Sequence, residues 1–194
     1  MTEEQAYDIV QTFEEFELRR YAPHVVAEVV VRGEFEDAGN MAFRTLFGYI
    51  SGQNRSGSKV AMTSPVIQRE PEQIAMTAPV QQRETSAGEY AVAFVLPSSF
   101  TLGRAPVPTS PEVQLHQRAA ALAAAHRYRG RWTQASFEHQ CRGLQSAVRA
   151  AGLTPVGSPR WARFDPPFVP WFLRRNEVVQ DVTEGSAQDD RLSS

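Results

Sequence analysis

Apolar residues recur at helical spacing in two separate stretches of the chain. The first stretch follows Asp37 as N-cap and ends at Gly52, with apolar positions at Phe43, Leu46, Phe47 and Ile50. The second follows the cap Thr133 and ends at Gly152, with apolar positions at Phe137, Cys141, Leu144, Val148 and Ala151. Spacing of three and four residues is typical of a helix that buries one face, so the pattern predicts two amphipathic helices.

Short β-branched and aromatic runs predict strands around these helices. The clearest are residues 89–96 before Pro97 and the neighbourhood of residues 161–164 before Pro166. Many turn signals and a single helix among the strands of each half favour an α+β fold with an antiparallel sheet.

A nearly literal repeat occupies the middle of the chain. Residues 59–70 read KVAMTSPVIQRE and residues 73–84 read QIAMTAPVQQRE. Each copy is apolar on both sides of a Thr-x-Pro, and proline within a strand indicates an edge or a bulge. We therefore expect two bent strands joined through residues 70–73, with Met62 and Met76 interpreted as matched core positions.

A fainter repeat appears at an offset of 97 residues. The matched positions are Leu18 and Leu115, Val25 and Leu122, Ala27 and Ala124, Val31 and Tyr128, Arg32-Gly33 and Arg129-Gly130, and Phe35 and Trp132. This offset predicts one domain over residues 7–182, with pseudo-twofold-related halves of about 7–96 and 97–182, between flexible tails at 1–6 and 183–194. The seam between such halves is a natural ligand site.

Composition narrows the choice of partners. The chain has 194 residues, a net charge of −2, 42% hydrophobic residues and one cysteine. This balance argues against nucleic acid or an anionic membrane as the main partner, and a single cysteine forms no internal disulfide. No apolar run approaches the roughly 18 residues of a membrane span, and the acidic start is unlike a signal peptide, so we expect a cytoplasmic protein.

Motifs for catalysis are absent from the sequence. It contains no G-x-S-x-G, no H-E-x-x-H and no paired cysteines, and its four histidines lack metal-ligand spacing. Cys141 lies on an apolar stripe and is interpreted as a small hydrophobe. The basic stretch 126–131 has two interpretations, a solvated sheet face or a site for a carboxylate-bearing ligand.

Four landmarks of the sequence resemble the SOUL family of heme-binding proteins. They are FELRRYAP at 16–23, the doubled AMTxPV, FVLPSSFTLGRAPVP at 94–108 and FDPPFVPWFLRRNEV at 164–178. The resemblance implies a distorted antiparallel β-barrel of two strand-helix-strand-strand halves, with two long helices outside it. It also implies reversible binding of heme or a related tetrapyrrole, for buffering, transport or signalling, rather than a reaction.

The resemblance departs from the family at one position. In the vertebrate relative with a proposed axial histidine, that histidine stands at the place of Arg20. Arginine keeps its proton in proteins, so Arg20 is a poor iron ligand. His24, four residues further on, is left as the nearby candidate for a weak axial bond.

A second vertebrate branch is thought to bind heme in an apolar pocket between the first helix and the late loop. The matching elements here are residues 41–50 and 166–173. The heme contacts that follow from the resemblance are Arg20, His24, Met41, Arg44, Phe47, Phe168, Trp171, Phe172 and Arg174. Porphyrins need a broad apolar slot and cations for two propionates, although such aromatics also form cores and such arginines also pair with acids such as Glu177.

Two other functions stay open. The same architecture resembles the drug-binding domains of the gyrase-inhibitor-like group, which predicts a pocket for flat or cationic hydrophobic molecules held by a buried carboxylate, Glu28 or Glu89. A tetrapyrrole-modifying enzyme ranks last, because the sequence supplies no recognisable general acid or base.

Overall fold

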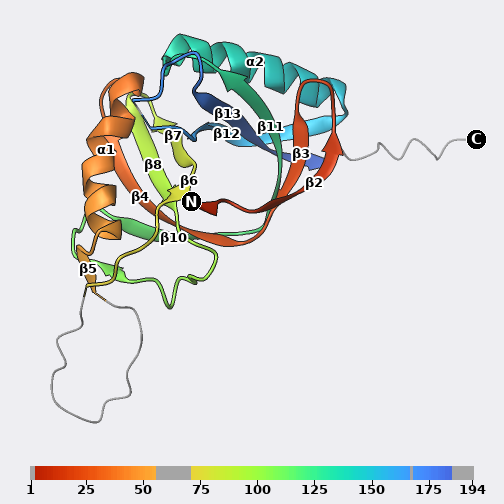
Figure 1. The fold of residues 1–194 in the computed structure, drawn as a ribbon. Helices are drawn as coiled ribbons and strands as arrows, with labels where there is room; N and C mark the ends of the chain where they lie inside the picture. The colour runs from red at the N-terminus through yellow and green to blue at the C-terminus, as the bar shows by residue number, and fades with distance from the viewer. Residues whose placement is uncertain (1–2, 56–70, 167, 185–194) are drawn as a thin grey trace, which may run out of the picture.

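The computed structural model describes residues 3–55, 71–166 and 168–184 (Figure 1). Its helices are α1 (Phe35–Ile50) and α2 (Gln134–Ala150). Its strands are β1 (Glu3–Glu4), β2 (Tyr7–Thr12), β3 (Glu17–Tyr21), β4 (His24–Arg32), β5 (Asn54–Arg55), β6 (Thr77–Ala78), β7 (Val80–Ser86), β8 (Glu89–Val95), β9 (Val107–Pro108), β10 (Gln114–Arg118), β11 (Ala121–Arg129), β12 (Leu153–Arg163) and β13 (Arg175–Glu184). The α+β class is confirmed.

One curved antiparallel sheet dominates the described residues. Its nine strands follow the order β10-β4-β8-β7-β12-β13-β11-β3-β2. The edge strands β10 and β2 do not pair with each other, so the predicted closure into a barrel is not seen in the strand pairing. The small pairs β1–β6 and β5–β9 lie outside this sheet.

The strand order relates the two predicted halves. β10 and β11 begin and end 97 residues after β3 and β4. Each half lends one strand to the other, because β10 pairs with β4 and β3 pairs with β11. Between β10 and β3 the strand order is symmetric about the β7–β12 pair. Each strand on one side of this pair has a counterpart at the same distance on the other side: β7 and β12, β8 and β13, β4 and β11, and β10 and β3. Two halves with the same strand topology would produce this order, with the β7–β12 pair at the seam between them. The duplication itself stays a prediction.

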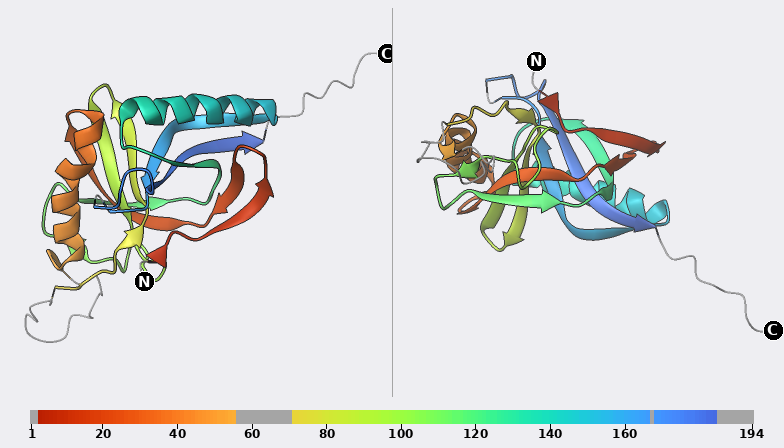
Figure 2. Two further views of the ribbon diagram at one scale, coloured as in Figure 1. Left: turned by 45° about the horizontal axis from the view of Figure 1, so that its top comes forward. Right: turned by 90° about the horizontal axis from the view of Figure 1, so that it is seen from below.

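The two faces of the sheet carry different side chains. α1 packs on β4 and β8, and α2 packs on β11, β12 and β13, as the views in Figure 2 show. Side chains alternate along a strand, so the large apolar residues of these strands meet the helices. The opposite face is lined by alanines and charged residues, among them Glu28, Ala91, Ala93, Ala123, Ala125, Arg160, Ala162 and Asp181.

Helix α1 differs from its sequence-based description. It begins at Phe35 after Glu34, so Asp37 is a first-turn residue and not the N-cap. Leu46 and Ile50 are buried as predicted, but Phe43 and Phe47 are 39% and 48% exposed. The predicted apolar face is wrong at these two positions, because the helix approaches the sheet through smaller residues, Ala38, Gly39 and Ala42.

Helix α2 confirms its prediction. The Thr133 hydroxyl accepts a hydrogen bond from the Ser136 amide, as an N-cap does. Cys141, Leu144 and Val148 are buried against the sheet. Burial also raises the pKa of Cys141 to about 12, so it stays a protonated thiol, in accord with its interpretation as a small hydrophobe.

Parts of both predicted tails lie in strands. β1 pairs with β6, and Gln5 Oε1 accepts a hydrogen bond from Gln81 while its Nε2 lies 3.1 Å from His24 Nε2, so residues 3–6 are not a flexible tail. β13 continues through Glu184, two residues into the predicted C-terminal tail. Residues 1–2, 185–194 and the first AMTxPV copy at 59–70 lie outside the described residues. In the second copy, β6 ends at Ala78 and β7 begins at Val80, on either side of Pro79, and the Ala78–Pro79 peptide is cis.

An aromatic cluster around Trp161 joins both helices to the seam. Trp161 on β12 is fully buried and stacks on Phe35 of α1 at 4.9 Å between ring centroids. Phe137 of α2 lies 6.0 Å from Trp161 and 5.3 Å from Phe35. The same ring therefore contacts one residue from each helix.

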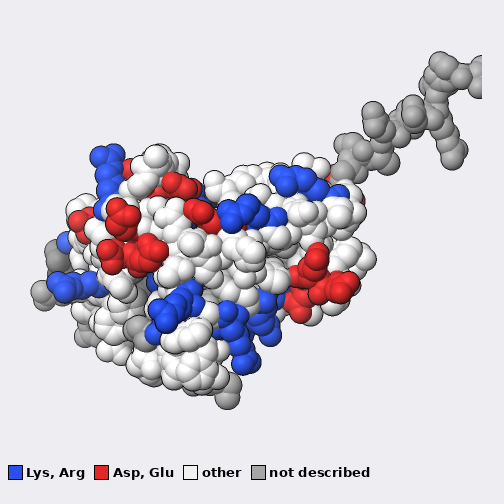
Figure 3. Space-filling view, turned by 90° about the horizontal axis from the view of Figure 1, so that it is seen from above, with Lys and Arg blue, Asp and Glu red and all other residues white. Residues whose placement is uncertain are grey.

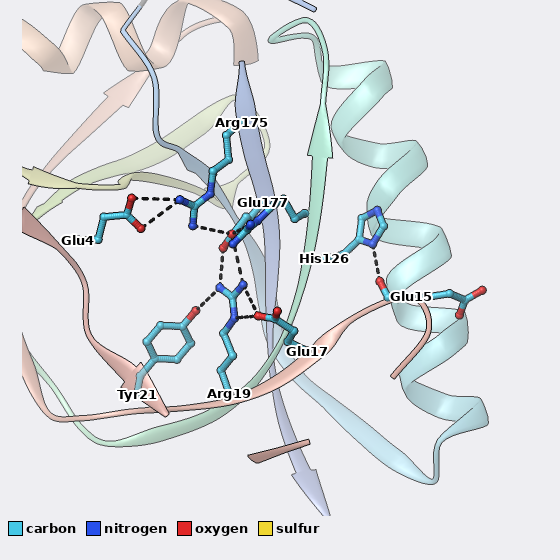
Figure 4. A network of polar contacts seen from close by, with 9 residues as sticks. Glu4, Glu15, Glu17, Arg19, Tyr21, His126, Arg175 and Glu177 are labelled. Carbon is cyan, nitrogen blue, oxygen red and sulfur yellow. Dashed lines mark hydrogen bonds and ion pairs between the residues drawn. The ribbon is translucent and has the colours of Figure 1, made fainter. Parts of the chain in front are cut away.

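A buried ionic network ties β3 to β13 (Figure 4). Arg19 and Glu177 are each 1% exposed and lie 2.6 Å apart. Arg127 and Arg175 also contact Glu177, at 3.2 and 3.1 Å. Burial alone would raise the pKa of Glu177, but the hydrogen bonds and charges of Arg19 and Arg175 outweigh it and hold the pKa below its usual range.

Replacing Trp161 by Ala should lower the free energy of unfolding by about 3–5 kcal/mol, because it removes a large buried ring that touches both helices. Chemical denaturation followed by circular dichroism measures this. Val156→Ala, at an exposed position of the same strand, is the matched control and should change stability by less than about 0.5 kcal/mol. Equal effects of the two variants would contradict the role given to Trp161.

Replacing Glu177 by Gln should cost about 3 kcal/mol at neutral pH, because three guanidinium groups lose their buried carboxylate. A carboxylate whose pKa is lowered by folding stabilises the protein above its unfolded pKa near 4.3, and this contribution is lost as pH falls below that value. Unfolding curves between about pH 3 and 7 should therefore show a flatter acid limb for the variant than for the wild type. Glu84→Gln, exposed on β7, should leave the limb unchanged.

Candidate functional site

An apolar pocket of about 440 Å³ opens between α1, β6 and the loop that joins β12 to β13. These are the elements that the resemblance to the SOUL family singled out, the first helix and the late loop. The apolar residues that line the pocket are Phe43, Met76, Ala78, Val80, Trp132, Phe164, Pro166 and Phe168.

One buried cation lies in the wall of this pocket. Arg163, the last residue of β12, is 7% exposed, and its guanidinium carbon lies 5.0 Å from the ring centroids of both Trp132 and Trp161. In the described part of the chain no acidic side chain lies within ion-pair distance of it, and its Nε atom has no hydrogen-bond partner. Burial lowers the pKa of Arg163 to about 10, so it is still protonated at neutral pH.

A glycine of α1 makes room for this guanidinium. A methyl group at Gly39 would overlap the end of the Arg163 side chain. Neither residue was expected at the site. The available signals were a glycine inside an amphipathic helix and an arginine two positions after Trp161, which alternation places on the same face of β12.

The other polar groups of the pocket are few. Thr77 Oγ1 is buried and has no hydrogen-bond partner among the described residues. Asp165 accepts a hydrogen bond from the Arg175 backbone amide, which fixes the start of the late loop. Thus Arg163 and Thr77 are two pocket residues with buried polar atoms that a ligand could satisfy.

Several predicted contacts lie in or beside the pocket. Phe168 lines it, Phe47 stacks on Phe43 at 5.7 Å, and the Arg174 guanidinium lies 4.3 Å from the Trp132 ring centroid. Trp171 and Phe172, on the same loop as Phe168, contact each other edge to face and are 49% and 56% exposed.

The other predicted contacts do not line this pocket. Met41 borders a separate depression beside β4, Arg44 is exposed on α1, and Arg20 is exposed on β3. His24 begins β4 and borders a cleft on the sheet face away from the helices. The nine residues therefore do not converge on one site.

Donors for iron are scarce in the pocket. Among the described residues that line it, Met76, 37% exposed, is the one with a sulfur or an imidazole. The sequence-based prediction placed Met76 in the core and so did not identify it as a pocket residue. The described residues contain no group of three or more His, Cys, Asp or Glu placed to hold a metal ion.

The cleft beside His24 is polar and has a volume of about 380 Å³. Its carboxylate Glu28 is 8% exposed and accepts hydrogen bonds from Arg118 at 2.5 Å and from Arg83 at 3.3 Å. Glu89, the other acid considered from sequence, lies at the start of β8 and pairs with the exposed Arg32. Glu28 is thus the inward-facing one of the two.

The surface carries both signs of charge. Acidic and basic side chains occur in separate small groups over the face shown in Figure 3. In the basic stretch 126–131, Arg127 pairs with Glu177 and Arg131 lies over the Trp171 ring. No helix of the described residues is long and apolar enough to cross a bilayer.

Solved structures share this fold at low sequence identity. The EcmrR C-terminal domain has a TM-score of 0.60 and 11% identity, over 92% of this chain and 98% of that chain. A hydrolase from Listeria innocua has a TM-score of 0.56 and 11% identity, over 90% and 94%. EcmrR in a DNA complex has a TM-score of 0.54 and 10% identity, over 88% and 57%. Such identities show the fold alone.

Sequence comparison gives a narrower result. No curated protein matches the chain. The family model described as SOUL heme-binding protein matches residues 2–181, a span that contains α1, the late loop and every residue of the apolar pocket. The chain therefore belongs to the SOUL heme-binding protein family.

Proposed function

We propose that the apolar pocket binds heme or a related tetrapyrrole reversibly, for buffering or transport, and that Arg163 pairs there with a propionate. The observation that carries the proposal is Arg163 itself, a buried cation that has no acidic partner among the described residues and lies in a mostly apolar wall. A buried charge is costly unless it is paired, and a ligand carboxylate would supply the missing partner.

The shape and lining of the pocket suit a flat apolar ligand. Its volume falls in the usual range for small-molecule sites, and the rings of Phe43, Trp132 and Phe168 offer stacking surfaces. Phe168 is 85% exposed, and Trp171 and Phe172 extend the aromatic surface along the same loop. A porphyrin edge that projects from the pocket would cover these rings, which otherwise form an exposed apolar patch.

Guanidinium groups bind carboxylates through two parallel hydrogen bonds. The low dielectric beside Trp132 and Trp161 strengthens such a pair relative to one in water. Arg163 is the single arginine among the described lining residues, so one propionate would pair with it while the other stays at the rim.

Iron coordination contributes little to this proposal. Bound heme would supply visible absorption and redox chemistry, but Met76 is the one soft donor in the described part of the lining and His24 lies elsewhere. The ring and the carboxylate therefore account for most of the affinity, and an iron-free porphyrin should bind nearly as well.

The alternatives are less well supported. A cationic ligand in this pocket would face the charge of Arg163. Asp165 is the one carboxylate among the described lining residues, and it accepts a hydrogen bond from a backbone amide, which suits a structural role. The names of the structural neighbours, a protein in a DNA complex and a hydrolase, describe those proteins.

Titration with hemin tests the pocket directly. Wild-type protein at micromolar concentration should give a saturable Soret shift. Arg163→Met should weaken binding about 10- to 100-fold, the loss expected for a charge-assisted hydrogen bond. Arg129→Met, exposed on β11 and outside the pocket, is the matched control and should bind like wild type. The proposal fails if no saturable shift is seen, or if Arg163→Met binds hemin as tightly as the control.

Comparison of porphyrins separates the propionate from the iron. Protoporphyrin IX should bind wild type within a few-fold of hemin, whereas its dimethyl ester should bind about tenfold or more weakly, because esterification removes the partner of Arg163. Fluorescence titration measures both. In Arg163→Met the acid and the ester should bind alike. His24→Ala should leave the hemin spectrum unchanged. Loss of the Soret shift in this variant would instead show that His24 takes part in heme binding.

A further inference from the structure

The polar cleft is a second cavity on the opposite side of the sheet from the apolar pocket. It lies on the face away from the helices, where β4, β7, β8, β10, β12 and β13 contribute its lining. Small side chains line it: Ala91 and Ala93, which are buried, and Ala119, Ala120 and Ala121, where β10 connects to β11. Because alanines leave space that larger residues would fill, a volume of about 380 Å³ stays open at the seam.

The charges that face the cleft are unequal. Three guanidiniums, from Arg83, Arg118 and Arg160, accompany two carboxylates, from Glu28 and Asp181. Asp181 is bound by Arg160 through two hydrogen bonds of 2.7 and 2.9 Å. The charges of Arg160 and Asp181 therefore compensate each other. The guanidiniums of Arg83 and Arg118 share the single carboxylate of Glu28.

Glu28 pairs with the two arginines without using up their donors. It contacts each of them through Nη2 alone. The remaining N–H groups of Arg83 and Arg118 form no hydrogen bond with the described residues. Both side chains are about one-third exposed, so these groups are accessible from the cleft.

The uncharged and titratable neighbours do not reverse this balance. Burial lowers the pKa of His24, so it is neutral at pH 7, and its ring contacts Gln5 and the Ala22 carbonyl. Tyr21 accepts a hydrogen bond from Arg19. His116 approaches Glu28 at 3.8 Å and adds positive charge if protonated.

From this arrangement we infer that the cleft is a binding site for a small organic anion with carboxylate groups, recognised by Arg83 and Arg118. The site is separate from the tetrapyrrole pocket, since Arg163 and Arg83 face opposite sides of the sheet. The charge of the expected ligand is opposite to that of a cation held by a buried carboxylate, because the charge of Glu28 is already compensated by arginines.

Isothermal titration with citrate, and with spermidine as the cationic counterpart, tests the inference. Wild-type protein should bind citrate saturably, with an affinity that falls as salt is added, and should not bind spermidine. Arg83→Gln should weaken citrate binding about tenfold, while Glu28 keeps Arg118 as its partner. Arg129→Gln, exposed on β11, is the matched control.

The informative variant is Glu28→Gln, because the two ligand signs predict opposite outcomes. For an anion site, removal of the competing carboxylate should raise the affinity for citrate several-fold; for a cation site it should abolish binding of spermidine. Thermal unfolding confirms that each variant is folded, and the hemin titration of Arg83→Gln should match wild type. The inference is overturned if citrate shows no saturable binding below about 10 mM, if Arg83→Gln binds it normally, or if Glu28→Gln binds it more weakly.

Discussion

The pairing of β7 with β12 is the constraint on which the rest of the structure depends. It joins the two halves of the sheet, with Trp161 opposite Gln82 and Arg163 opposite Val80. Side chains alternate along a strand, so Trp161 and Arg163 face the helices while Arg160 and Ala162 face the other side. One strand thereby supplies the centre of the core, the cation of the apolar pocket and a wall of the polar cleft.

Arg163 is unfavourable for the stability of the fold but suited to binding a ligand. The core gains from the aromatic stack of Trp161, whereas a buried guanidinium without a carboxylate opposes folding. Gly39 adds to the conflict, since glycine is a weak helix former and its role here is to leave space for that guanidinium. Local features that disfavour folding are expected at functional sites, and in this chain two of them meet in one pocket.

The two cavities differ because the two faces of the sheet differ. The helix-covered face is rich in aromatic residues and holds Arg163, a charge without an ionic partner in the described part of the chain, which suits a flat apolar ligand with a carboxylate. The opposite face combines alanines with ion pairs, of which Arg19–Glu177 is fully enclosed and stabilises the sheet, while Glu28 leaves parts of its arginines available. The buried Arg19–Glu177 pair therefore stabilises the fold, whereas the arginines beside Glu28 keep hydrogen-bond donors that a ligand could use.

The sequence by itself determined the α+β class, the second helix with its Thr133 cap, the family, and the helix and loop that border the apolar pocket. These follow from periodicity, capping and local motifs, which act over a few residues. It did not determine that Phe43 and Phe47 are exposed, that His24 lies outside the pocket or that Arg163 lies within it. Those facts depend on how α1 rotates against the sheet and on the register of β7 with β12, strands some 80 residues apart, which only long-range packing decides.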